Sequence, residues 1–446
     1  MIDSLRCENF RCFRDTGTLK LAPLTLIFGE NNSGKSSILQ ALHLPALTLQ
    51  SEDPGVCLKL FHQDYDYGSF TDLVFQHDED AQFTLIFGKS VNAEVFRGRK
   101  TKLEKIDAKL QLTYGYLRRR KEIYLRQFIL EDSNGPRLQI SQTKYADISK
   151  IWMREHKGES KYLSRLFERK GFFFYPRYDP FVTQVRLERH YGKESGAKVL
   201  EEMWMDAQLR SSFASSFLNL DLLGPLRIPA RRTYQYWGEI PGRIGVTGNQ
   251  AFQKYSALLR RGKREDRQKV GSINEALYQL GFINKLEARQ IGAMHYEFWT
   301  QHSESLLRAN LADTGFGASQ VLPVIISLYT SQDGATLLYE QPEIHLHPAA
   351  QAELGSVFAR ACSSEKRIVI ETHSENLILR IQTEIAKGKL KPRDVIIYYV
   401  HPTKEGHQVR EIPLDEKGQF LTEWPKGFFE ESYQESLKLS KARHEG

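Results

Sequence analysis

The sequence predicts an α/β fold in which a largely parallel sheet carries an antiparallel β-meander and a mainly helical insertion. Three observations support this prediction. An apolar run, a glycine-bearing loop and a helical segment follow one another near the N-terminus. Apolar strands and amphipathic helices alternate after residue 306, and short strands broken by turn signals lie between the two regions. The 446 residues are enough for about two or three domains, or for one elaborated domain.

The first lobe, residues 1–142, is predicted to be mostly strands. The segments "LRCENFRCFRD", "TLKLAPLTLIF" and "AQFTLIFGK" have the apolar alternation and short apolar runs of strands. A β-meander follows over residues 108–141, where "DSNGP" is a strong turn signal. In this meander Arg118–Lys121 form a basic run, which makes a single patch only if the chain turns there.

Residues 143–305 are predicted to form a mainly helical insertion or lid. Two segments have the composition of helices: "ISKIWMREHKGESKYLSRLFERKG" and "AKVLEEMWMDAQLRSSFASSFLNL". Residues 223–270 have the composition of loops that precede a further helix. The basic run Arg260–Lys269 also contains acidic residues and is predicted to be a solvated loop. A second lobe, residues 306–446, returns to alternating strands and helices.

Composition excludes some classes of protein. The N-terminus has no apolar signal core, and the run "VLPVIISLY" is far too short to span a bilayer, so we expect a soluble cytoplasmic protein with no membrane partner. The four cysteines form no metal-type pair and no disulfide framework. The net charge of +7 permits contact with nucleic acid but does not require it.

The segment "TLIFGENNSGKSSILQAL" predicts a nucleotide-phosphate site. It contains GxxxxGKS between an apolar strand and a helix, which we expect to end at Pro45. Backbone N–H groups of such a loop cradle phosphate, Lys35 would reach the β- and γ-phosphates of ATP, and Ser36 would bind Mg²⁺. The predicted nucleotide-binding residues are Gly29, Asn31, Asn32, Ser33, Gly34, Lys35, Ser36 and Ser37.

The segment "TLLYEQPEIHLHP" predicts the other half of this site. Glu340 ends an apolar strand at the sheet edge where ligands bind, so it would hold the Mg²⁺ shell. Gln341 follows where many P-loop ATPases place the carboxylate that activates water, and an amide cannot accept that proton. Glu343 is the nearest replacement and Glu371 the next. The chain is therefore either a slow ATPase assisted by Glu343 or a switch that holds ATP.

Three further features belong to the candidate site. His373 follows the apolar strand "KRIVIE", from where it could reach the γ-phosphate or the attacking water. The loop "DTGFGASQ" precedes an apolar helix and offers a second anion site, with Ser319 as its nucleotide contact. His345 and His347 face the same way on an extended segment, but no third ligand completes a metal site.

These motifs, in this order, resemble the ABC-type ATPase heads of the SMC, RecF and OLD group. The phrases "LGPLR", "DTGFGASQVLPV", "EQPEIHLHPAAQAEL", "ETHSENLILRIQ" and "WPKGFFEE" are similar to bacterial single-head ATPases with an uncharacterised C-terminal domain. The resemblance implies that Glu340 replaces the Walker B aspartate and that His373 is the switch histidine. It also implies that Asp313–Gln320 cap the ATP of a second protomer, that His345–Pro348 form the D-loop, and that Gln76 is a Q-loop metal ligand.

The resemblance also implies a function. We expect an ABC-type ATPase that uses ATP and Mg²⁺, forms a homodimer or higher homo-oligomer through its ATP sites, and acts as sensor or scaffold for a separate nuclease in bacterial antiviral defence. Within this resemblance, the expected role is similar to that of the ATPase component of Septu-type systems. A RecF-like ATP-gated DNA-binding repair protein and a non-hydrolysing nucleotide-gated module remain alternatives. No DxD pair follows His373, so the chain itself is not expected to be a nuclease.

Overall fold

The computed structural model describes residues 1–423 of the chain, apart from positions 63, 98–99, 143–149, 155–157, 161, 236–237, 282–284, 293, 302–306 and 364. The tail segment "WPKGFFEE", which contributes to the family resemblance, lies outside the described residues.

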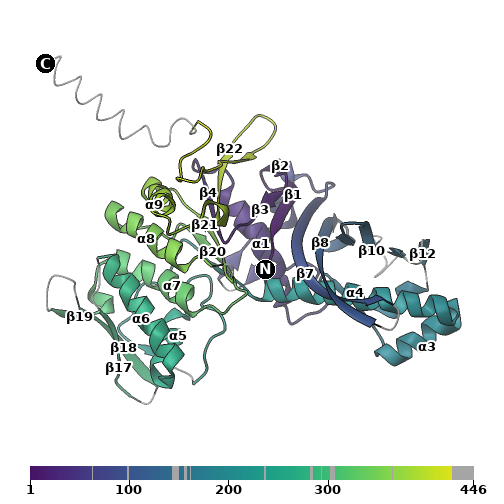
Figure 1. The fold of residues 1–446 in the computed structure, drawn as a ribbon, viewed down its shortest axis with the longest axis horizontal. Helices are drawn as coiled ribbons and strands as arrows, with labels where there is room; N and C mark the ends of the chain where they lie inside the picture. Colours follow the sequence, from purple (N-terminus) through teal and green to yellow (C-terminus); the bar gives the residue numbers. More distant parts are fainter. Residues whose placement is uncertain are drawn as a thin grey trace.

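A six-stranded sheet lies at the centre of the molecule (Figure 1). Its first five strands run parallel, and only the last pair is antiparallel. Parallel strands need crossover connections, which here are mostly helices. The spatial order is β15 (Leu220–Leu223), β20 (Thr336–Glu340), β21 (Arg367–Glu371), β4 (Leu24–Gly29), β22 (Val395–His401) and β23 (Gln408–Glu411).

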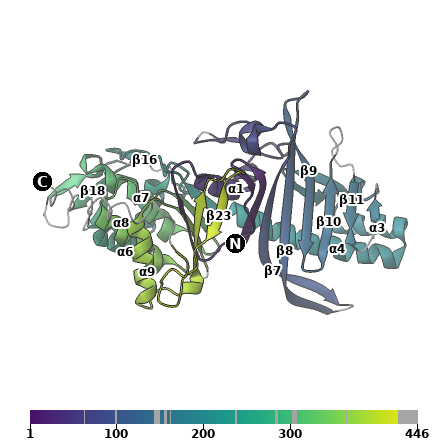
Figure 2. The same cartoon turned by 90° about the horizontal axis from the view of Figure 1, so that it is seen from above.

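A nine-stranded antiparallel sheet lies beside the central one, and its long strands are seen side by side in Figure 2. In spatial order its strands are β12 (Gly158–Ser160), β11 (Lys150–Met153), β10 (Gly135–Ser141), β9 (Glu122–Asp132), β8 (Lys100–Leu117), β7 (Phe83–Arg97), β1 (Ser4–Phe10) and β2 (Phe13–Asp15), with β3 (Leu19–Lys20) also paired to β1. The predicted meander is therefore part of a larger sheet that begins at the N-terminus.

Helices cover both sheets. In Figure 1 α3 and α4 lie with the nine-stranded sheet, and α5 to α9 lie on the opposite side of the molecule. The helices are α1 (Lys35–Leu49), α2 (Phe70–Leu73), α3 (Pro180–Tyr191), α4 (Lys193–Leu218), α5 (Ala251–Arg261), α6 (Arg264–Gln279), α7 (Phe316–Thr330), α8 (Pro348–Ala361) and α9 (Glu375–Ala386). Within the described part of the chain, none of them is both long and apolar enough to cross a membrane.

Smaller elements complete the described fold. The strands are β5 (Phe61–His62) with β6 (Tyr65–Asp66), β13 (Phe167–Lys170) with β14 (Phe173–Pro176), and a small sheet of β16 (Tyr234–Gln235), β17 (Lys285–Gln290), β18 (His295–Gln301) and β19 (Arg308–Asn310). The 3₁₀ turns are η1 (Phe75–His77), η3 (Leu163–Leu166), η4 (Leu311–Asp313) and η5 (Pro392–Asp394).

The central sheet separates two hydrophobic cores. Successive side chains of a strand point to opposite faces. On β4, accordingly, Ile27 joins the core that also contains the nine-stranded sheet, whereas Leu26 and Phe28 join the core formed with α7, α8 and α9. Strands buried on both faces read as continuous apolar runs, which is why "LTLIF" and "TLLY" are recognisable in the sequence.

This arrangement confirms the predicted α/β fold with a largely parallel sheet, a β-meander and helical segments. One predicted helix, over residues 148–171, is wrong: its described residues form β11, β12, η3 and β13. Ile151 and Met153 are buried on either side of a half-buried Trp152, so the apolar period is two and the segment extends the edge of the sheet.

Two local predictions also need correction. Pro45 lies inside α1, which continues to Leu49, because Leu44, Ala46 and Leu47 around it are all buried and their packing offsets the lost N–H bond. Residues 260–269 are not a loop but the end of α5 and the start of α6. The acidic side chains there lie in the first turn of α6, where the helix dipole favours them. Arg118–Lys121, in contrast, do form a turn, between β8 and β9.

The predicted domain boundaries at 142 and 305 fall next to residues outside the described set and stay a prediction. Within the range 143–305, β15 pairs with β20 and so belongs to the central sheet rather than to a separate lid. The segment that follows β15 can therefore reach the edge of that sheet where the candidate site lies.

Buried His43 on α1 is expected to make the stability of the fold depend on pH. Its Nδ1 lies 2.6 Å from the hydroxyl of buried Tyr67, and burial lowers the pKa of His43 to about 3. Below about pH 6.5 this histidine is protonated in the unfolded chain but stays neutral in the folded chain. The free energy of unfolding therefore falls as the pH drops from about 6.5 to 3, by up to about 1.4 kcal/mol per pH unit.

Urea unfolding at pH 7 and pH 5 measures this contribution. The loss of unfolding free energy between the two pH values should be smaller by about 1–2 kcal/mol in His43→Gln than in the wild type. His77→Gln, an exposed histidine in η1, should leave the loss unchanged. An equal loss in the wild type and His43→Gln would show that His43 does not carry the effect.

Candidate ATP site

The phosphate loop has the backbone that its glycines permit. Gly29 ends β4 with φ 151°, and Gly34 precedes α1 with φ 94°. A Cβ atom at Gly29 would lie 2.2 Å from the Val400 carbonyl oxygen, and one at Gly34 would lie 2.3 Å from Cys12 Sγ. Both positions therefore exclude any residue with a side chain. Between them Asn31 and Asn32 are exposed.

Lys35 is held against this loop. Its Nζ donates to the Gly29 carbonyl oxygen at 3.2 Å and to the Glu30 carbonyl oxygen at 2.6 Å, and the residue is only 3% exposed. Burial lowers the pKa of Lys35, while the carboxylates of Glu371, Glu30 and Glu343 oppose that shift. The ammonium group thus lies over the phosphate loop and near the acidic groups at the sheet edge.

The hydroxyls of the phosphate loop lie in different environments. Ser33 Oγ is buried without a hydrogen-bond partner among the described residues, and the Ser33 carbonyl is held by His407, whose Nδ1 is 2.7 Å away. Ser36 is half-buried, and its hydroxyl opposes the rise in the pKa of the Glu371 carboxyl. Ser37 is buried. Ser36 is therefore the loop hydroxyl that already meets a carboxylate.

Two carboxylates stand side by side at the C-terminal edge of the central sheet. Glu340 on β20 is the register partner of Glu371 on β21, and β21 lies between β20 and the phosphate-loop strand β4. Burial and then the Glu371 charge raise the pKa of Glu340 to about 8. Burial also raises the pKa of Glu371, opposed by its bond from Ser36 and by Lys35. Glu371 therefore interacts both with Glu340 and with the phosphate-loop residues Lys35 and Ser36.

Glu343 is a third buried carboxylate of this site. Its Oε1 accepts from Thr372 Oγ1 at 2.7 Å and from the His373 N–H at 2.9 Å, while burial raises its pKa. These two bonds fix the side chain at the end of β21. Glu343 is therefore anchored beside the predicted switch histidine.

Each of the three carboxylates keeps one buried oxygen with no hydrogen-bond partner in the described structure: Glu340 Oε1, Glu343 Oε2 and Glu371 Oε2. Buried oxygens without partners call for a cation or a water. No cluster of three histidine, cysteine, aspartate or glutamate side chains in the described chain could hold a metal by itself. This fits Mg²⁺, which keeps waters and phosphate oxygens as ligands and needs only one or two protein oxygens.

Gln341 occupies a tight turn rather than the buried cluster. It has φ 44°, its N–H donates to the Glu371 carbonyl oxygen at 2.9 Å, and its side chain is half-buried. A left-handed backbone costs energy for a residue other than glycine, and such strain clusters at functional sites. The turn is fixed between β20 and the segment that contains Glu343.

His373 follows β21, and its backbone N–H donates to Glu343. Burial, and then the charge of Lys35, lower the pKa of His373 to about 4. The imidazole is therefore neutral at pH 7 and can both donate and accept a hydrogen bond there.

The sequence analysis missed Arg227. This residue is 5% exposed, and its guanidinium donates to the Glu340 carbonyl oxygen at 2.9 Å, to the Gln341 carbonyl oxygen at 3.1 Å and to the Gln320 carbonyl oxygen at 3.3 Å. It ties the strand-end turn to α7. The phrase "LGPLR" contained it, but no local pattern reveals contacts that span roughly a hundred positions of the chain.

We expect Arg227→Met to lower the free energy of unfolding by about 2–4 kcal/mol, because two buried carbonyl oxygens and a partly buried one lose a charged donor. Chemical denaturation of the whole chain measures this. Arg231→Met, four residues later and exposed, should stay within about 0.5 kcal/mol of the wild type. A similar small change in Arg227→Met would mean that the turn holds without its arginine.

The loop Asp313–Gln320 lies against the histidine segment. A Cβ atom at Gly317 would be 2.6 Å from the His345 carbonyl oxygen, so the two backbones touch. Asp313 and Gly315 are exposed, whereas Ser319 is only 4% exposed, so its nucleotide contact stays a prediction. His345 and His347 are both exposed, and His347 Nδ1 accepts the Ala349 N–H to cap α8.

Gln76 is the predicted site residue least connected to the others. It is exposed in η1 with φ 58°, and no contact recorded for the described residues joins it to Ser36 or to the three carboxylates. Its role as a metal ligand stays a prediction.

Two family profiles match the chain. Residues 24–380 match the family described as "AAA domain, putative AbiEii toxin, Type IV TA system", and residues 390–439 match a "Protein of unknown function (DUF3696)". The predicted resemblance to P-loop ATPases with an uncharacterised C-terminal domain is thereby confirmed. No curated protein matches the chain.

Among solved structures, similar chains include SMC heads. One is an Smc head bound to the C-terminal winged-helix domain of ScpA (11% identity, 93% of this chain and 98% of that chain, TM-score 0.44). Another is the SMC head domain from Thermotoga maritima (10% identity, 93% and 99%, TM-score 0.39). A third is the Smc head with an extended coiled coil from Pyrococcus furiosus, bound to the C-terminal domain of ScpA (9% identity, 99% and 99%, TM-score 0.42).

Proposed function

The chain belongs to this AAA-domain family of P-loop ATPases, and from that premise we propose that it binds ATP with Mg²⁺ and hydrolyses it slowly. The observation that carries the proposal is the set of three buried carboxylates, each with a free oxygen: the charges of Glu371 and Glu343 act on Lys35, and Glu340 is the strand partner of Glu371. Lys35 would leave the carbonyl oxygens of its own loop for the β- and γ-phosphates, and Ser36 would turn from Glu371 to the metal.

When bound, Mg²⁺ would neutralise charge on the transferring phosphoryl group. The oxygens of Ser36 and Glu340 would hold its shell, with Glu371 beside them. A cation would also favour the ionised form of Glu340, whose raised pKa of about 8 leaves it mostly protonated at neutral pH otherwise. The Glu340–Glu371 pair would therefore be stabilised in its ionised form by a bound cation.

We assign Glu343 to the attacking water and Gln341 to its positioning. Glu343 presents one anchored oxygen to Thr372 and His373 and keeps the other free, which suits a residue that must accept a proton at a fixed place. Neutral His373, beside Lys35, would donate a hydrogen bond toward the γ-phosphate. Gln341 could orient the water but could not take its proton.

We further propose that two copies of the chain close around ATP. Asp313 and Gly315, at the exposed end of the loop before α7, would then face the nucleotide of the second copy. The closed dimer would act as sensor or scaffold for a separately encoded nuclease in antiviral defence, as in Septu-type systems. The description of the family as toxin-associated supports a defence role.

Light scattering and phosphate release on the purified full chain test this function. With Mg²⁺ and ATP the wild type should release phosphate slowly, and Glu343→Gln should double its molar mass and keep its ATP. When the chain is expressed together with the products of the neighbouring genes, we expect a nuclease to co-purify with it. A constant mass and intact ATP in the wild type would contradict the proposal.

A nucleotide-held switch without turnover is the second candidate, and Gln341 is the observation that favours it. In that case the wild type would retain unhydrolysed ATP through purification. A RecF-like DNA-binding protein would instead bind duplex DNA by itself with strong dependence on salt.

A further inference from the structure

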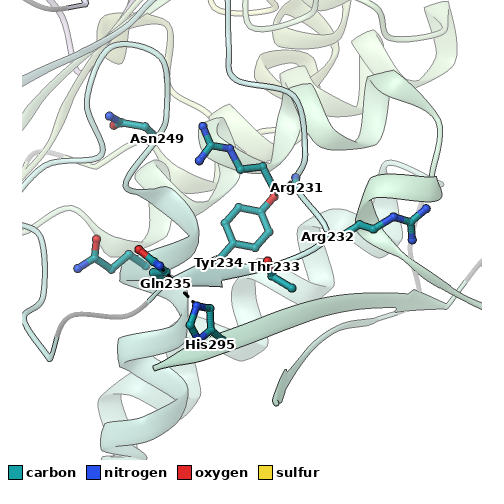
Figure 3. Close-up of a pocket in the computed structure, with 8 residues that line it drawn as sticks. Arg231, Arg232, Thr233, Tyr234, Gln235, Asn249 and His295 are labelled. Atoms are coloured by element: carbon teal, nitrogen blue, oxygen red, sulfur yellow. Dashed lines mark hydrogen bonds between the residues drawn. The ribbon is translucent and has the colours of Figure 1, made fainter. Parts of the chain in front are cut away.

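A polar cavity lies in the small sheet and helix pair that precede α7. It has a volume of about 500 Å³ and lies between β16, the start of β18 and the start of α5 (Figure 3). All of its lining side chains are polar or aromatic, and none is a carboxylate. The polar side chains used below are Arg231, Arg232, Gln235, Asn249, Gln253 and His295.

The charge of this cavity is positive. In Figure 3 the Arg231 guanidinium lies on the Asn249 side of the Tyr234 ring, whereas Arg232 extends the other way. Among the described residues Arg231 has no acidic partner, and its backbone N–H donates to the Tyr234 hydroxyl at 2.8 Å, which fixes the base of its side chain. Arg232 meets both oxygens of Asp313 at 3.0 Å and 2.6 Å.

A helix end adds to this field. α5 begins at Ala251 with Gln250 before it and no side-chain cap. The Ala251 N–H donates to the Gly248 carbonyl oxygen at 3.1 Å, whereas the N–H groups of Phe252 and Gln253 have no cap among the described residues. Asn249 and Gln253 flank that end and line the cavity. Arginine together with a helix N-terminus favours a phosphate, and side-chain amides pair with the edges of bases.

We propose that this cavity binds a nucleoside phosphate, either free or at the end of a nucleic-acid strand. Arg231 and the α5 N-terminus would hold the phosphate, and the amides of Gln235, Asn249 and Gln253 would contact the base and sugar. The volume matches the lower part of the range of small-molecule sites. The cavity is distinct from the phosphate loop, which lies at the end of β4.

The same backbone segment connects this cavity to the ATP site. Arg227 holds the carbonyl oxygens of Glu340 and Gln341, and four residues later Arg231 reaches the cavity. Arg232 holds Asp313, at the exposed end of the loop before α7. A phosphate on Arg231 would therefore be held one residue away from the arginine that holds the exposed end of this loop. This coupling rests on the proposed function, whereas the binding itself does not.

Fluorescence anisotropy with a fluorescein-labelled, 5′-phosphorylated pentanucleotide tests the binding. The full chain carrying Lys35→Ala should bind the probe as tightly as the wild type, which separates this cavity from the phosphate loop. Adding Arg231→Gln should weaken binding by about tenfold or more. Adding instead Arg289→Gln, an exposed arginine of β17 outside the cavity, should change affinity less than about twofold.

Competitors identify the source of the phosphate. If AMP displaces the probe at the same concentration as the unlabelled pentanucleotide does, the ligand is a free nucleotide. If only strands displace the probe, the ligand is a strand end. Either result supports the proposal if adenosine competes much less. Binding that does not depend on Arg231, or equal displacement by poly-glutamate, would overturn it. Unchanged thermal unfolding of the Arg231→Gln variant excludes misfolding as the cause.

Discussion

Glu343→Gln is expected to lower the rate of ATP hydrolysis by about 100- to 10,000-fold, the usual contribution of a general base. The amide can still accept the bonds from Thr372 and the His373 N–H, so the local structure should survive. What it cannot do is accept a proton from water at neutral pH. Steady-state phosphate release from Mg·ATP measures the change.

The variant should still bind ATP, because its phosphate loop is intact. A matched control is Glu416→Gln, an exposed carboxylate far along the chain, which should hydrolyse ATP at the wild-type rate. A fall of less than about threefold in Glu343→Gln would assign the proton to another group, and Glu371, which interacts with Ser36, is the next candidate.

Lys35→Ala is expected to weaken ATP binding by about 100-fold or more, because one charge-assisted contact to phosphate is commonly worth about 1.5–3 kcal/mol and Lys35 would make more than one. Its Nζ already lies against the loop, bonded to the carbonyl oxygens of Gly29 and Glu30. Titration of the variant with a fluorescent ATP analogue measures the loss. Lys20→Ala, an exposed lysine on β3, should bind as the wild type does. Affinity within about threefold of the wild type would place the nucleotide elsewhere.

The local patterns of the phosphate loop and of the buried strands were enough to predict the central sheet. Apolar runs such as "LTLIF" mark strands that are covered on both faces, and the glycines of the loop mark backbone that only glycine allows. Both features depend on neighbours in sequence. The same reasoning placed Glu340, Gln341, Glu343 and His373 at strand ends.

Features that depend on contacts between distant segments could not be predicted. The period of two in "KIWM" is too short to distinguish an edge strand from a helix, and the rest of that segment has helical composition. β15 follows a long helix, and only its pairing with β20 places it in the central sheet. Arg227 contacts backbone carbonyl groups. Every residue has such a group, so the residue types in the sequence do not reveal the contact. The effect of Ser36 on the Glu371 carboxyl likewise follows from strand order, because β21 lies between β20 and β4.

The central claim is that Glu343, rather than Gln341, lets this site cleave ATP. A single-turnover assay tests it most directly: the protein is loaded with radiolabelled ATP and Mg²⁺, and phosphate release is followed over hours. We predict slow release by the wild type, at least equal release by Gln341→Glu, and almost none by Glu343→Gln. ATP that stays intact in the wild type and is cleaved only after Gln341→Glu would contradict this claim and make the chain a nucleotide-held switch.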